Sequence, residues 1–104
     1  MKKIYTLSTC STSKRIIKEQ ELEKKGYIFQ DIKTEKITPA QLDEMKALAG
    51  SYEALFSRRA QKYKSMGLKD KKLTETDYRR LILEEYTFLK RPVIINGQQI
   101  SAGS

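Results

Sequence analysis

Short apolar stretches alternate with longer amphipathic ones along the chain, and their order predicts a sheet interrupted by helices. Residues 3–7 alternate and are rich in β-branched and aromatic side chains, which predicts a first strand. Residues 11–25 are typical of a helix, with Gly26 where a left-handed C-terminal cap is needed. A second strand is expected over 27–32. This β-α-β order predicts a parallel pair of strands.

The middle of the chain has the signals of three consecutive helices. Thr38, Pro39 and Gln41 combine an N-cap hydroxyl, a proline at the first helical position and a glutamine three residues after the cap. A second helix is expected to end near Gly67, and Thr74 caps a third. The three apolar stripes are Leu42, Met45, Leu48 and Ala49; Tyr52, Leu55, Phe56, Ala60 and Tyr63; and Tyr78, Leu81, Ile82, Tyr86 and Leu89.

The last part of the chain predicts a β-hairpin. Val93 to Ile95 and 98–101 read as strands, and Asn96-Gly97 between them is a hairpin signal. The predicted class is therefore α/β, a thioredoxin-like mixed four-stranded sheet with a helical insertion over about 38–89. We expect a single domain over 1–104, without the further C-terminal helix that usually closes this plan.

Composition limits the functions that this fold could have. The longest apolar run, Val93 to Ile95, is far short of the roughly 20 residues of a membrane span, so we expect a cytoplasmic protein. One cysteine cannot form an internal disulfide. A net charge of +8 suits phosphate-like anions, acidic protein surfaces or nucleic acid. Since no nucleic-acid motif accompanies it, we do not expect direct nucleic-acid binding.

Cys10 lies where the first strand gives way to the first predicted helix. Unpaired backbone N–H groups and the helix dipole favour negative charge there, so the pKa of this thiol should fall below its ordinary value of about 8.5. Lys14 and Arg15 follow closely and would add to that effect. The alternative is that Cys10 is a small buried apolar residue, a common role for free cysteine.

Two familiar cysteine motifs do not fit this segment. A phosphatase-like loop places five residues between cysteine and arginine, whereas four separate Cys10 from Arg15. A dithiol redox motif needs a second cysteine where Ser13 stands. The Ser13 hydroxyl can donate a hydrogen bond to the Cys10 sulfur, or it can simply cap the helix.

Three segments, in the expected order, resemble motifs of the arsenate reductase/Spx (ArsC-like) family. They are YTLSTCSTSKR at 5–15, LFSRRAQKY at 55–63 and LKRPV at 89–93. The resemblance implies a thioredoxin-like fold with Cys10 as the nucleophile and with a cis bond before Pro92. It also implies that Ser13, Lys14, Arg59 and Arg91 surround an anion pocket, without a metal.

The two arginines can also be considered without the family. Arg59 has helical spacing with Phe56, Ala60 and Tyr63, which places its charge on or beside the apolar stripe. A bound anion would give it a partner there. A structural ion pair or a side chain that snorkels to solvent is the alternative. Arg58 is expected to face solvent. For Arg91, the alternative to a binding role is an exposed arginine beside a buried turn proline.

The resemblance implies a thiol-dependent oxidoreductase of the arsenate reductase type. No cofactor would be bound, and glutathione with glutaredoxin would reduce the adduct formed at Cys10. The alternative is an Spx-like transcription regulator that binds RNA polymerase without turnover. The family's arsenate-reducing members carry a further arginine after the proline motif, and 92–104 contain none; Ala60 and Arg58 stand where the family has glycine and threonine. The oxyanion, the physiological reductant and the oligomeric state are left open.

Overall fold

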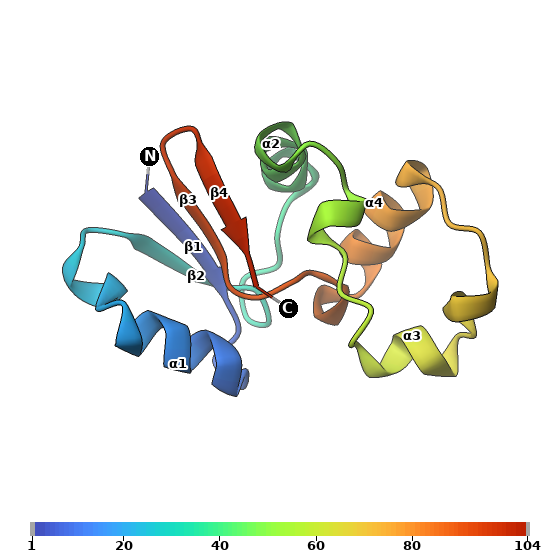
Figure 1. Ribbon diagram of the computed structural model, residues 1–104, viewed down its shortest axis with the longest axis horizontal. Helices are drawn as coiled ribbons and strands as arrows, with labels where there is room; N and C mark the ends of the chain where they lie inside the picture. The colour runs from blue at the N-terminus through green and yellow to red at the C-terminus, as the bar shows by residue number, and fades with distance from the viewer. Residues whose placement is uncertain (1, 104) are drawn as a thin grey trace. The chain divides into compact units, whose positions relative to one another are not determined.

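The computed structural model describes residues 2–103 (Figure 1). Contacts between residues divide the chain into two compact units. The sheet unit comprises residues 2–36 and 91–103, and the helical unit comprises residues 37–90. No helix among the described residues is long and apolar enough to cross a membrane.

The sheet unit contains the predicted mixed four-stranded sheet, which confirms the α/β fold class. Its strands are β1 (Lys2–Thr6), β2 (Ile28–Asp31), β3 (Val93–Asn96) and β4 (Gln99–Ala102). The strand order is β2-β1-β3-β4, in which β1 and β2 are parallel and the other two pairs are antiparallel (Figure 1). The first β-α-β unit and the C-terminal hairpin therefore meet along β1.

Helix α1 (Ser11–Glu19) covers one face of this sheet and is shorter than the sequence pattern predicts (Figure 1). The expected helix to Lys25 is wrong, because Glu21 takes a left-handed conformation with φ of 53° and begins the 3-10 turn η1 (Leu22–Lys24). The turn places the side chain of Leu22 against the sheet. The resulting buried cluster consists of Ile4, Ile17 and Leu22.

The hairpin between β3 and β4 forms as predicted, although its loop begins one residue later. Asn96 still pairs with Gln99, so Gly97 and Gln98 make the two-residue turn. Gly97 has φ of 62°, a conformation that glycine adopts without a steric penalty.

The helical unit begins at the predicted helix start. Helix α2 (Pro39–Ala49) has a capping box in which the Gln41 N–H donates to Thr38 Oγ1 and the Thr38 N–H donates to Gln41 Oε1, each at 3.1 Å. Leu42 and Met45 are completely buried. The predicted stripe of this helix therefore faces the interior of the unit.

The second predicted helix, from Tyr52 to near Gly67, is wrong. In its place the chain forms the 3-10 turn η2 (Glu53–Leu55), an extended stretch, the short helix α3 (Gln61–Ser65) and the 3-10 turn η3 (Leu68–Asp70). Two long-range backbone hydrogen bonds replace helical ones. The Ser57 N–H donates to the Phe88 carbonyl at 2.7 Å, and the Lys90 N–H donates to the Leu55 carbonyl at 2.8 Å.

An aromatic cluster explains why the extended stretch is favoured. Phe56 is completely buried, and its ring centroid lies 4.9 Å from that of Tyr78 and 5.0 Å from that of Phe88. Leu55 ends the turn η2 and Phe56 is extended, and this change of backbone conformation lets both side chains be buried. A helix would not bury the two residues in this way.

The third predicted helix forms but ends before its apolar stripe does. Helix α4 (Glu75–Glu84) starts with the predicted cap at Thr74. It ends because Glu85 is extended and its carboxylate accepts from the Thr87 N–H at the start of the 3-10 turn η4 (Tyr86–Phe88). Leu89 therefore reaches the core from a strand-like segment that pairs with Phe56.

The carboxylate of Glu75 links α4 to η2, and its removal tests this link. It accepts hydrogen bonds from the backbone N–H groups of Tyr52, at 2.7 Å, and Glu53, at 3.1 Å. We expect Glu75→Ala to lower the free energy of unfolding by about 1 kcal/mol, measured by urea titration.

Glu84→Ala is the matched control on the same helix. Among residues 2–103 the Glu84 carboxylate pairs only with the exposed Arg80, at 3.5 Å, so the change should stay within about 0.5 kcal/mol. Equal effects of the two variants would show that Glu75 does not anchor η2.

Candidate functional site

Cys10 occupies the N-cap of α1, directly after the loop that leaves β1, as predicted. Its N–H donates to the Leu7 carbonyl at 2.9 Å, and its carbonyl accepts the Lys14 N–H at 3.2 Å. The first bond closes a turn and the second begins the helix. The side chain is partly exposed, so the sulfur can meet a reactant from solvent.

The end of β2 fixes the loop that carries Cys10. Hydrogen bonds from the Ser8 hydroxyl and the Lys33 N–H, with a weaker contribution from the Ser8 backbone, lower the pKa of Asp31. The Lys33 bond is 3.0 Å long, and the Ile32 N–H donates to the Thr6 carbonyl at 2.9 Å. Sequence reasoning missed Asp31; its position at the carboxyl end of a strand beside the cysteine loop was the available signal.

Opposing effects act on the Cys10 sulfur, and those that favour its charged form prevail. Partial burial raises the pKa of Cys10. Hydrogen bonding by the Ser13 hydroxyl and backbone N–H, and by the Arg91 guanidinium together with its charge, lowers it. The net pKa is below the ordinary value, so a larger fraction of the thiol is ionised at neutral pH.

Ser13 is placed by the inner face of α1. It is completely buried, and apart from the Cys10 sulfur its Oγ has no hydrogen-bond partner among residues 2–103. A buried hydroxyl that donates to nothing lowers the stability of the fold. A neighbouring group that becomes an acceptor on ionisation is therefore stabilised by this hydroxyl. Ionised Cys10 is that acceptor, three positions before Ser13 at the helix start.

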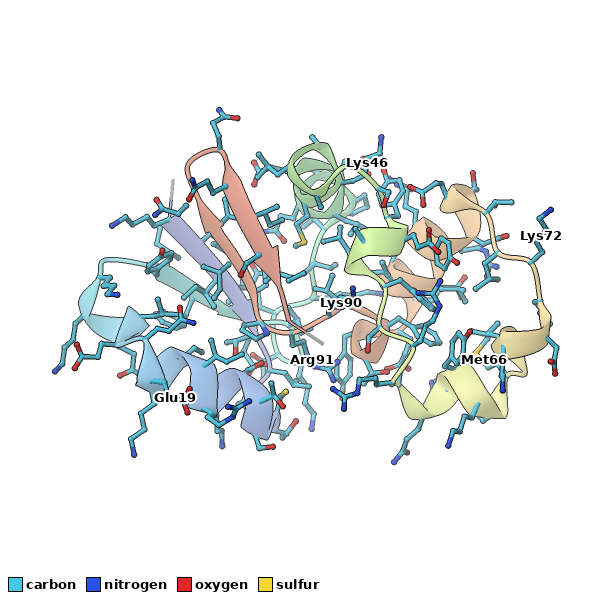
Figure 2. The ribbon with its side chains drawn as sticks, viewed as in Figure 1. Glu19, Lys46, Met66, Lys72, Lys90 and Arg91 are labelled. Carbon is cyan, nitrogen blue, oxygen red and sulfur yellow. The ribbon has the colours of Figure 1, made fainter. Side chains whose placement is uncertain are left out.

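Arg91 reaches the same sulfur from the second segment of the sheet unit, residues 91–103. It follows Lys90 and begins the segment that leads into β3 (Figure 2). The Arg91–Pro92 bond is cis, the isomer that the resemblance implies, and Pro92 is buried. The structure therefore brings together three of the predicted site residues, Cys10, Ser13 and Arg91.

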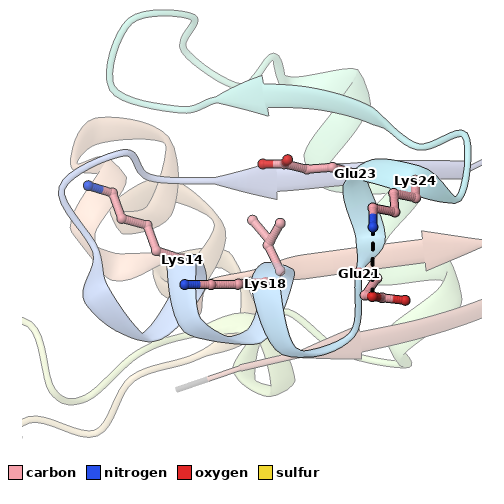
Figure 3. Close-up of a pocket in the computed structure, with 6 residues that line it drawn as sticks. Lys14, Lys18, Glu21, Glu23 and Lys24 are labelled. Carbon is pink, nitrogen blue, oxygen red and sulfur yellow. Dashed lines mark ion pairs between the residues drawn. The ribbon is translucent and has the colours of Figure 1, made fainter.

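The other basic residues of the cysteine segment have different surroundings. Arg15, expected to help the thiolate, forms an exposed ion pair with Glu19 at 3.8 Å. Lys14 is exposed on α1 and lines an open groove that does not include Cys10 (Figure 3). Its role in anion binding stays a prediction.

That groove is formed by α1 and η1 and has a volume of about 600 Å³. Its mixed charges include the Glu21–Lys24 ion pair at 3.9 Å, drawn as a dashed line in Figure 3. With both signs of charge and no link to the sulfur, it does not resemble an anion site. The groove is lined by Lys14, Ile17, Lys18, Glu21, Glu23 and Lys24.

The expectation that Arg59 lies on a helix beside an apolar stripe is wrong. Arg59 follows the extended stretch, is exposed, and its N–H donates to Ser57 Oγ at 3.4 Å. Arg58 is exposed, as expected, and it also has partners on the surface of its unit. Its guanidinium contacts Glu53 at 2.8 Å and the Tyr78 hydroxyl at 3.1 Å. Arg59 belongs to the helical unit, and its part in anion binding stays a prediction.

The sheet unit has a thioredoxin-like fold with a cysteine at the start of its first helix, and comparison with known proteins identifies the family. The ArsC family model matches residues 5–104. The chain belongs to the ArsC family. Among curated proteins, none matches the sequence.

Solved structures agree with this fold. The YffB protein is 23% identical with a TM-score of 0.85, covering 100% of this chain and 91% of that one. Arsenate reductase from Vibrio cholerae is 18% identical with a TM-score of 0.82, covering 98% and 88%. An arsenate reductase (ArsC) related protein from Brucella melitensis is 23% identical with a TM-score of 0.77, covering 99% and 86%. At these identities the likeness shows the fold alone.

Substitution of Ser13 tests its contribution to the thiolate. We expect Ser13→Ala to slow alkylation of Cys10 at pH 6 by about tenfold, since a hydrogen bond to a charged group contributes about 1.5 kcal/mol. Iodoacetamide labelling followed by mass spectrometry measures the rate. Ser11→Ala, at the exposed first position of α1, is the control and should leave the rate unchanged. A Ser13→Ala rate equal to wild type would contradict the assignment.

The lowered pKa of Cys10 also makes stability depend on pH. Because folding lowers the pKa of the Cys10 thiol, ionisation stabilises the folded chain. The free energy of unfolding of wild type relative to Cys10→Ser should be largest above pH 8.5 and diminish as pH falls through the folded-state pKa. Urea unfolding at pH 5, 7 and 9 measures it, and a difference that is constant with pH would contradict a stabilised thiolate.

Proposed function

We propose that this ArsC-family chain is a thiol-dependent oxidoreductase in which the Cys10 thiolate attacks an oxyanion or a disulfide. Glutathione, acting with glutaredoxin, returns Cys10 to its reduced form. The observation that supports this function is the single cysteine at the start of α1, where Ser13 and Arg91 favour the charged sulfur.

With an oxyanion as substrate, Cys10 Sγ bonds to the central atom and one oxygen leaves as water after protonation. Glutathione then attacks Sγ, and the electron pair of the bond between Sγ and the central atom passes to that atom, which is reduced by two electrons. The products are the reduced oxyanion and a Cys10–glutathione disulfide. A second glutathione, through glutaredoxin, exchanges with this disulfide and releases oxidised glutathione and the Cys10 thiolate.

With a disulfide as substrate, the first step is thiol–disulfide exchange. The Cys10 thiolate attacks one sulfur, and the other leaves as a thiolate. The mixed disulfide is then resolved by the same glutathione step. In both reactions the Arg91 guanidinium stabilises the negative charge of the Cys10 thiolate before attack. It therefore raises the fraction of Cys10 that is present as the nucleophile. Arg59 and Lys14 enter the proposal through the family resemblance, as further cations for an anionic substrate.

Turnover with purified components tests the function. Oxidation of NADPH, coupled through glutathione reductase, is followed with glutathione, glutaredoxin and either arsenate or hydroxyethyl disulfide. Wild type should turn over at least one of the two substrates, and Cys10→Ser should reduce that rate to background. Arg91→Ala should lower kcat/KM by roughly tenfold, because loss of a hydrogen bond to the charged sulfur, about 1.5 kcal/mol, reduces the fraction of thiolate.

Arg80→Ala is the matched control for removal of an arginine. The Arg80 side chain is 54% exposed and pairs with Asp77 and Glu84 on its own helix, so turnover should be unchanged. No turnover with either substrate, or full activity in Cys10→Ser, would refute the reductase.

The net charge of +8 favours a second candidate, an Spx-like regulator that binds RNA polymerase through its helical insertion. This function requires capture of polymerase by tagged chain without NADPH oxidation in the assay above. Capture that persists in Cys10→Ser, together with absent turnover, would select the regulator.

A further inference from the structure

Gly103 lies against the backbone of the residue that reaches the Cys10 sulfur. A Cβ added at Gly103 would overlap the Arg91 carbonyl oxygen, and would lie 2.7 Å from the Arg91 carbonyl carbon and 3.0 Å from Pro92 Cδ. The Gly103 N–H also donates to the Pro92 carbonyl at 3.0 Å. The end of β4 thus holds the segment that starts β3.

This close approach is unlike the situation of the other four glycines. Gly26, Gly50, Gly67 and Gly97 have positive φ, and a Cβ on any of them would meet nothing within 4 Å. At those four positions glycine allows the left-handed backbone conformation. Gly103 has no positive φ, so what it supplies is the absence of a side chain next to Arg91.

Both sides of the contact are backbone, so neither can turn away as a flexible side chain could. An alanine at 103 must displace the Arg91 carbonyl, its own chain, or both. The Arg91 guanidinium is positioned by that same backbone, and its hydrogen bond to sulfur depends on distance and angle.

We propose that Gly103 is a positioning residue, which lets β4 pack against the Arg91 backbone and thereby holds the guanidinium at Cys10. This role rests on the thiolate site of the proposed function and not on any substrate. It makes the reactivity of Cys10 depend on a residue at the far end of the sequence that does not react itself.

The test is the pH profile of Cys10 alkylation in wild type, Gly103→Ala, Arg91→Ala and the double variant. Gly103→Ala should slow alkylation at pH 6 by about threefold or more, and its profile should shift to higher pH in the direction of the Arg91→Ala profile. In the Arg91→Ala background, Gly103→Ala should have no further effect, because it acts through the guanidinium.

Gly97→Ala is the matched control. It lies in the same hairpin and is strained by its φ of 62°, but its Cβ would meet nothing within 4 Å. It should lower the urea midpoint of unfolding and leave the pH profile unchanged. An equal shift in Gly97→Ala, or additive effects in the double variant, would overturn the proposal.

A measurement on wild type answers the question even where Gly103→Ala does not fold. Because coupling between two sites is reciprocal, the amide resonance of Gly103 should follow the ionisation of Cys10 in a pH titration by NMR, whereas that of Gly97 should not. In Cys10→Ser the Gly103 titration should vanish. A Gly103 resonance that stays constant while Cys10 titrates would overturn the role of Gly103. Failure of the reductase assay alone would leave it standing.

Discussion

The hydrogen bonding that favours charge on the Cys10 sulfur is the interaction on which the candidate site depends. Burial alone would raise the pKa of Cys10, and compensation comes from two segments far apart in the sequence. Ser13 is local and belongs to the same helix turn. Arg91 is not local, and the sheet brings it near because β1 and β3 pair antiparallel, with Tyr5 opposite Val93. The chain leaves β1 toward Cys10 at the same end of the sheet at which Arg91 leads into β3.

Local chemistry explains why much of this arrangement could be predicted from sequence. The strand pattern, the turn at Gly97 and the capping residues Thr38 and Thr74 act over a few neighbours, and each element that they predict is present. The same holds for Cys10, because its position at a helix N-terminus follows from the change of pattern between 7 and 11. The order of strands then determines the fold class.

The errors occur where distant backbone competes with local periodicity. The stripe through Leu55 and Phe56 has helical spacing, yet pairing with 88–90 supplies hydrogen bonds that let both side chains be buried without a helix. Without that helix, the expected place of Arg59 beside an apolar stripe is lost, and both arginines are exposed. Arg58 turns to Glu53 and Tyr78, and Arg59 is exposed. The paired segments, 55–57 and 88–90, are too far apart in the sequence for a local hydrophobic pattern to contain both. Periodicity alone therefore could not reveal that these long-range hydrogen bonds replace helical ones.

Charge balance at the sulfur relates the substrate to the number of cations. One thiolate and the Arg91 guanidinium compensate each other, so a disulfide, which carries no charge at the reacting atoms, needs nothing more. An oxyanion brings further negative charge close to the thiolate, and this repulsion must be offset by another cation. Residues 92–104 contain no arginine, which leaves Arg59 as the guanidinium that the family resemblance offers. Reaction with an oxyanion should therefore depend on Arg59 far more than reaction with a disulfide does.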